Sequence, residues 1–64
     1  MKINGKKLEA ARTAARVTRS NLAVGIGQTH VRVWQLCTEA ESNVNELVGN
    51  KLAEMLNVPV EAIQ

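Results

Sequence analysis

The chain has 64 residues, 45% of them hydrophobic, and a formal net charge of +2. A chain this short forms one small domain over residues 1–64, because it buries only about 60% of its unfolded surface. Phe and Tyr are absent and Trp34 is the only aromatic residue, so the core must come from Leu, Ile, Val, Met and Ala. This composition favours compact helices over a β-sandwich, and we expect an all-α fold.

The first two helices are predicted from caps and apolar spacing. Asn4 can cap a helix that runs to about Arg16, and its apolar residues recur three and four positions apart. They are Leu8, Ala11 and Ala15. Thr18 is the predicted cap of a second helix over residues 19–25, which is expected to end at Gly25-Ile26-Gly27.

Residues 19–38 have the spacing of a helix-turn-helix. Ala23 supplies a small side chain where two helices cross, and Gly27 can enter the left-handed region where the chain must turn sharply. Thr29 is the predicted cap of a third helix over residues 30–37. The apolar residues that would anchor this segment are Leu22, Ile26, Val33 and Leu36.

The strongest helical periodicity in the chain predicts a fourth helix after a polar connection from Thr38 to Asn43. Asn43 and Glu46 have the spacing of a capping box, and Asn57 can close the helix in the left-handed conformation. A last helical turn after Pro59 would bring the number of helices to five. The apolar stripe of the fourth helix is Val44, Leu47, Val48, Leu52, Met55 and Leu56.

Basic residues are concentrated in the first 38 residues. Seven Lys and Arg face a single acidic residue there, a net charge of +6, whereas residues 39–64 have a net charge of −4. Lysine and arginine displace condensed counterions from phosphate, so a basic half that contains the helix-turn-helix suits a polyanion-binding surface. A solvated helix face is the alternative, and charge alone does not decide between them.

Together these residues resemble the lambda repressor/Cro family of helix-turn-helix regulators, over about residues 6 to 63. The resemblance implies a five-helix DNA-binding domain that places its third helix in the major groove of double-stranded DNA. The shortness of the chain suggests a small repressor of a phage or mobile element, in the cytoplasm of a bacterial or phage-infected cell. The matching residues are Leu8, Arg12, Val17, Thr18, Leu22, Ala23, Ile26, Gly27, Val33, Leu36 and the stretch 52–59.

Members of this family usually bind DNA as two-fold homodimers, with half-sites about 10 bp apart. The apolar residues Val58, Val60 and Ile63 are the expected dimer surface of this chain. A domain this small could also dimerise only on DNA.

Three features depart from the family pattern, one of which is that Thr38 and Glu39 stand where a glycine commonly follows the third helix. Gln28 stands where the family often has an apolar residue, and Cys37 stands where relatives commonly have a glutamate. In relatives that glutamate can pair with the arginine of the first helix, here Arg12. We therefore expect Arg12 to pair with Glu39 or Glu41, or to turn outward toward phosphate.

The helical repeat predicts one exposed stripe on the third helix, with His30, Val31, Trp34, Gln35 and Thr38. The resemblance implies base-edge contacts for His30, Val31 and Gln35, and phosphate contacts for Arg19 and Thr38. Gln35 can bind adenine bidentately, Val31 can pack on a thymine methyl group, and His30 can donate to a guanine acceptor. Arg19 gains support from the start of the second helix, which attracts phosphate.

Thr29, Arg32 and Trp34 complete the candidate DNA-binding set. Arg32 flanks the stripe and is either a phosphate contact or a solvated arginine. Trp34 could lie on the DNA side, at a protein interface or in the core, and Val31 could be an ordinary core residue.

A rival interpretation keeps the fold but changes the partner. An anti-repressor or antitoxin-like module would use Trp34 and Val31 to bind another protein. The acidic Glu39 and Glu41 beside the supposed DNA face favour this reading, because they would repel phosphate.

Other functional classes find little support in the sequence. Cys37 is the only cysteine, so no intrachain disulfide can form, and with His30 it makes no metal-ligand set. Ser20 and Ser42 lack a histidine at a suitable spacing, and no glycine cluster precedes a phosphate-loop lysine. No apolar run approaches the roughly 20 residues of a membrane span. We expect neither an enzyme nor a membrane protein, and no cofactor or small-molecule ligand.

Overall fold

The computed structural model describes all 64 residues and contains four α-helices, one 3-10 helix and a two-stranded sheet. The elements in chain order are β1 (Lys2–Asn4), α1 (Gly5–Ala15), α2 (Arg19–Ile26), α3 (His30–Thr38), β2 (Glu41–Asn43), α4 (Glu46–Leu56) and η1 (Val60–Ile63). The fold is mostly helical, as predicted. It differs from an all-α, five-helix fold in having a small sheet and in the 3-10 form of the last helix.

Side-chain caps fix where the helices begin. Asn4, Thr18 and Thr29 each accept a hydrogen bond from the backbone N–H three residues further on, at 3.0, 3.1 and 3.1 Å. These three caps confirm the sequence prediction. The cap of α4 is Asn45, which accepts the equivalent bond at 2.8 Å. The prediction of Asn43 was wrong because that residue ends β2.

Left-handed residues end three of the helices. Gly27 has φ 68° and Asn57 has φ 56°, both as predicted, and Arg16 adopts φ 57° as well. Gly27 matters most for the site because it redirects the chain between α2 and α3, which only three residues connect. Gln28 in this connection is exposed, and its backbone N–H donates to the carbonyl of Ala23 at 3.0 Å.

The sheet joins the N-terminus to the segment after α3. Its strands are antiparallel, with Ile3 opposite Ser42, and both of these residues are buried. Gly5 follows β1 at a point of close approach, since a Cβ there would lie 2.0 Å from the backbone oxygen of Glu39. The predicted polar connection from Thr38 to Asn43 therefore contains a strand that anchors the end of α3.

Every helix and β1 contribute to a single core. α1 packs against α3 and η1, and α2 packs against α3 and α4. Two members of the predicted apolar pattern lie outside this core, since Ala15 is exposed and Leu47 is 79% exposed. The buried apolar residues are Ile3, Leu8, Leu22, Ala23, Val33, Leu36, Cys37, Val48, Leu52, Ala53, Leu56 and Ile63.

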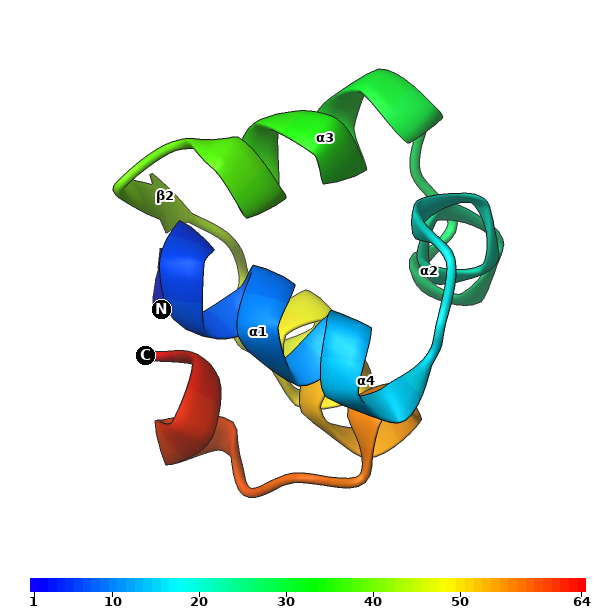
Figure 1. Cartoon of the computed structure of the whole chain (residues 1–64). Coiled ribbons are helices and arrows are strands. Elements are labelled where there is room, and N and C mark those ends of the chain that lie inside the picture. Colours follow the sequence, from blue (N-terminus) through cyan, green and yellow to red (C-terminus); the bar gives the residue numbers. More distant parts are fainter.

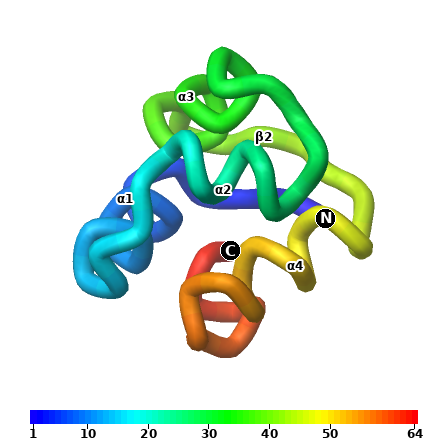
Figure 2. The backbone as a smooth tube through the Cα atoms, turned by 90° about the vertical axis from the view of Figure 1, so that its right-hand side faces the viewer, coloured from blue at the N-terminus to red at the C-terminus, as the bar shows by residue number.

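This packing places α3 at the outside of the molecule. In Figure 1 α3 lies along the upper edge and η1 along the lower edge, with α1 between them. Figure 2, turned by 90°, keeps α3 at the top, with α2 in front of it. One side of α3 therefore faces the core while the other has no helix over it. No helix of the chain has the length and apolar character needed to cross a membrane.

Candidate nucleic-acid interface

The outer face of α3 carries the residues that the helical repeat predicted. His30, Val31, Trp34 and Thr38 are exposed, and Gln35 is half-buried. Val31 is 64% exposed and Trp34 is 51% exposed, so neither is a core residue. The buried side of the same helix is formed by Val33, Leu36 and Cys37.

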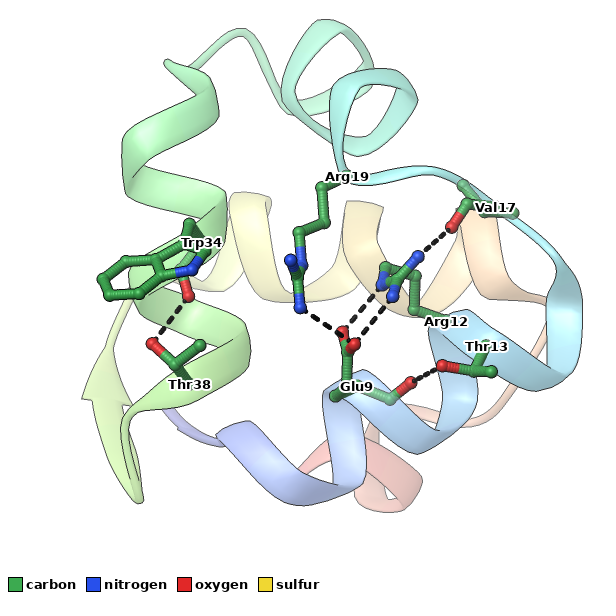
Figure 3. Close-up of polar contacts among 7 residues, drawn as sticks. All are labelled: Glu9, Arg12, Thr13, Val17, Arg19, Trp34 and Thr38. Atoms are coloured by element: carbon green, nitrogen blue, oxygen red, sulfur yellow. Dashed lines mark hydrogen bonds and ion pairs between the residues drawn. The ribbon is translucent and has the colours of Figure 1, made fainter.

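The hydroxyl group of Thr38 makes a hydrogen bond within its own helix. Its Oγ1 donates to the backbone carbonyl of Trp34 at 2.8 Å, one turn earlier. Figure 3 shows the indole ring of Trp34 on the opposite side of α3 from Arg19 and Glu9. Trp34 and Thr38 therefore belong to one patch of α3 that points away from the interior ion pairs.

Arg12 has a different partner from those expected. Its Nε donates to Oε1 of Glu9 and its Nη2 to Oε2 of Glu9, both at 2.7 Å, and its Nη1 donates to the carbonyl of Val17 at 2.9 Å. The expectation that Arg12 would reach Glu39, Glu41 or phosphate was wrong. Glu9 lies three residues earlier on the same helical face, where a bidentate pair forms without any tertiary rearrangement.

Arg19 joins the same carboxylate from α2. Its Nη2 donates to Oε2 of Glu9 at 3.0 Å, and its Nε is buried without a partner. Figure 3 shows Arg12 and Arg19 converging on Glu9. The pKa of Glu9 is lowered to about 2, mainly by the hydrogen bonds from Arg12, while the charges of Arg12 and Arg19 act in the same direction and burial opposes them. Arg19 is thus held by the protein rather than extended toward solvent.

The buried thiol of Cys37 belongs to the same surroundings. Burial raises the pKa of Cys37, and the neighbouring Glu9 carboxylate acts in the same direction. The Cys37 side chain is therefore a neutral thiol at neutral pH.

Arg32 connects α3 to the sheet. Its Nη2 donates to the backbone carbonyl of Asn43 at 2.9 Å. Antiparallel strands alternate the direction of their backbone groups, and the bonded pair between Met1 and Val44 turns the carbonyl of Asn43 toward the free edge of β2. Arg32 therefore covers part of an open strand edge.

The acidic residues after α3 are partly balanced. Glu41 lies 3.8 Å from the Nζ of Lys2, and Oε2 of Glu39 accepts from Ser42 at 3.3 Å. Lys2 and Arg32 line the same polar cleft as both glutamates. Glu39 and Glu41 consequently do not form a purely negative surface at the end of α3.

The structure brings five of the eight candidate residues onto one face and assigns contacts within the protein to the other three. Thr29 caps α3, Arg19 pairs with Glu9, and Arg32 reaches β2. Sequence reasoning missed Glu9, although its spacing of three residues from Arg12 was a readable signal. The expected dimer surface was also wrong at Ile63, which is fully buried.

No protein-family model, curated protein or solved structure gives a significant match to the chain. The structure also contains no group of three His, Cys, Asp or Glu side chains that could hold a metal ion. The outer face of α3 and the charges around it are therefore the basis for a functional assignment.

Proposed function

We propose that the chain is a helix-turn-helix regulator of the small repressor or Cro kind, which binds operator DNA with α3 in the major groove. The observation that carries this proposal is the outer face of α3, which no helix covers and where Val31 and Trp34 are more than half exposed. His30 and Gln35 lie on the same face and can hydrogen-bond base edges.

The connection between α2 and α3 supports the same function. Three residues join the helices, with Gly27 in the left-handed conformation and Thr29 capping α3. The core residues Ala23 and Val33 hold α2 and α3 to the body of the domain. This arrangement presents α3 as a rigid element, which a helix entering a DNA groove requires.

Charge supports DNA as the partner. Lys6, Lys7 and Arg16 are exposed and take part in no ion pair. They remain available for phosphate, whereas Arg12 and Arg19 share Glu9. We assign the salt-sensitive part of the binding free energy mainly to the three exposed cations.

Binding to duplexes with a randomised core, measured at several salt concentrations, tests the proposal. The logarithm of the binding constant should fall with the logarithm of salt concentration, with a slope of about −0.9 for each phosphate contact. Gln35→Ala should weaken binding to a selected duplex by roughly 1–3 kcal/mol and relax its sequence preference. Asn50→Ala, which removes an exposed amide on α4, is the matched control and should leave both unchanged.

Absence of binding to random and selected duplexes at low salt would refute the DNA-binding function. Unchanged base preferences in Gln35→Ala would instead refute the role of α3. A two-fold dimer formed on DNA, acting in the cytoplasm, fits this function. The side chain of Ile63 takes no part in its contact surface, because it is fully buried.

A protein-interaction module of the anti-repressor or antitoxin type is the second candidate. It is favoured by the adjacent exposure of Val31 and Trp34, because tryptophan is enriched in protein interfaces. Trp34 fluorescence separates the two functions, since DNA in contact with α3 should change its emission and shield it from a neutral quencher. A folded Trp34→Ala variant with unaltered DNA affinity would favour the protein partner.

A further inference from the structure

We infer that α3 reads thymine methyl groups at the centre of its binding site, so that A·T pairs rather than G·C pairs lie under Val31 and Trp34. This inference rests on the proposed DNA-binding function and adds the base class to it. It starts from the order of side chains across the exposed face. By the helical repeat, Val31, Trp34 and Thr38 occupy the middle of that face, with His30 and Gln35 on its two margins.

The middle of the face is poor in free hydrogen-bonding groups. The hydroxyl of Thr38 donates to the carbonyl of Trp34 at 2.8 Å, so its proton is not available to a base. Val31 has only methyl groups at its tip, and Trp34 has a single N–H on a large apolar ring. A base pair under this part of α3 is contacted mainly by carbon atoms.

No guanidinium or ammonium group is free on this face. Arg32, the only cationic residue of α3, donates to the carbonyl of Asn43 on the sheet side. Arg19 is held by Glu9. Because arginine or lysine makes the commonest specific contact with guanine O6 and N7, the face lacks the usual means of recognising G·C pairs.

The cost of removing water from the base edges strengthens the preference of α3 for A·T pairs over G·C pairs. The major-groove edge of a G·C pair presents only polar groups at its hydrogen-bonding positions, whereas an A·T pair adds the thymine C5-methyl. Covering polar groups with Val31 and Trp34 would remove their water without replacing the hydrogen bonds. Covering a thymine methyl with the same side chains buries apolar surface on both molecules. Gln35 at the margin can bind the adenine of such a pair.

Selection of duplexes with a randomised core, followed by replacement of single thymines with deoxyuridine, tests the inference. Deoxyuridine keeps the base pair and removes only the C5-methyl group. We expect thymines at the contacted positions, and binding about fourfold weaker for each contacted methyl that is removed, the value expected for one buried apolar carbon.

Variants assign the effect to α3. In Val31→Ala or Trp34→Ala, at least one replacement of thymine by deoxyuridine should no longer weaken binding, because the side chain that touched the methyl group is gone. Val24→Ala removes a valine on α2 that is even more exposed than Val31 and should keep the full deoxyuridine effect. Circular dichroism confirms that all three variants are folded.

The outcomes distinguish this inference from the proposed function. Selected duplexes with G·C pairs under Val31 and Trp34, or thymines whose methyl groups can be removed without loss of affinity, would overturn methyl reading while leaving DNA binding intact. Failure to select any duplex would overturn both.

Discussion

α3 and α4 are both capped amphipathic helices, but they use their outer faces differently. α4 buries Val48, Leu52 and Leu56 and exposes mainly polar side chains, with Leu47 as its one large exposed apolar residue. α3 buries a comparable apolar side and also exposes Val31 and Trp34. An exposed apolar pair that the core does not use indicates an interaction surface more strongly than a single exposed leucine does.

The largest expected effect separates the core side of α4 from the outer face of α3. Leu52→Ala should destabilise the domain by about 2–5 kcal/mol, because a fully buried leucine leaves a cavity. A domain of this size has little more stability than that, so the variant should be largely unfolded. Trp34→Ala removes a larger but half-exposed side chain and should keep the helical content. Circular dichroism with urea denaturation measures both.

A strongly destabilised Trp34→Ala would break the comparison, because Trp34 would then act as a core anchor. A Leu52→Ala variant as stable as the wild-type protein would also contradict the comparison, because Leu52 would then not be needed for the core. If both variants behave as expected, loss of binding in Trp34→Ala can be assigned to the surface itself rather than to unfolding.

Local signals in the sequence predicted where the four α-helices lie, although the cap of α4 is Asn45 rather than Asn43. Thr18 and Thr29 cap α2 and α3, and Asn57 closes α4, as their residue types favour. The sheet could not be predicted in this way. Its strands have three residues each, and Glu41, Ser42 and Asn43 are not residues that favour strands. Only their pairing with the N-terminus makes them a strand.

The exposed face of α3 was also predictable, because the helical repeat separates Val31 and Trp34 from Val33 and Leu36. The partner of Arg12 was not. The expectation drawn from a family resemblance pointed to residues after α3, while the actual partner of Arg12 lies within α1. Likewise Leu47 fits the periodic stripe of α4 but is exposed, because no other element covers that part of the helix.

A smaller effect is expected on the inner side of α3, where Glu9 holds Arg12 and Arg19. Glu9→Gln should cost about 1–2 kcal/mol, because two partly buried arginines lose a charged acceptor and solvent screens part of the loss. Glu54→Gln, which breaks the exposed pair with Lys51 on α4, is the control and should cost at most about 0.5 kcal/mol. Urea denaturation at pH 7 compares the two variants.

The pH dependence of stability tests whether the charged Glu9 carboxylate causes the destabilisation expected in Glu9→Gln. Folding lowers the pKa of Glu9 from 4.5 to about 2, so its contribution to stability is present above pH 4.5 and is lost as pH falls toward 2. The stability difference between the wild-type protein and Glu9→Gln should shrink over that range. A difference that is constant from pH 7 to pH 2 would contradict the assigned ion pairs.

The smallest effect compares the two helix caps. Thr29→Ala removes the acceptor for the first turn of α3, and Asn45→Ala removes the acceptor for the first turn of α4. Each should cost about 1 kcal/mol of stability, because a backbone N–H loses its partner in either helix. Urea denaturation should therefore give similar midpoints for the two variants.

DNA binding should separate these two variants even though their stabilities match. Thr29→Ala loosens the start of α3 next to His30 and should weaken binding to a selected duplex, since the base-contacting residues lose part of their rigid support. Asn45→Ala loosens a helix whose outer face takes no part in the proposed contact, and its affinity should stay within twofold of the wild type. Equal losses of affinity in both variants would show that binding follows overall stability. The outer face of α3 would then not be the DNA-binding surface.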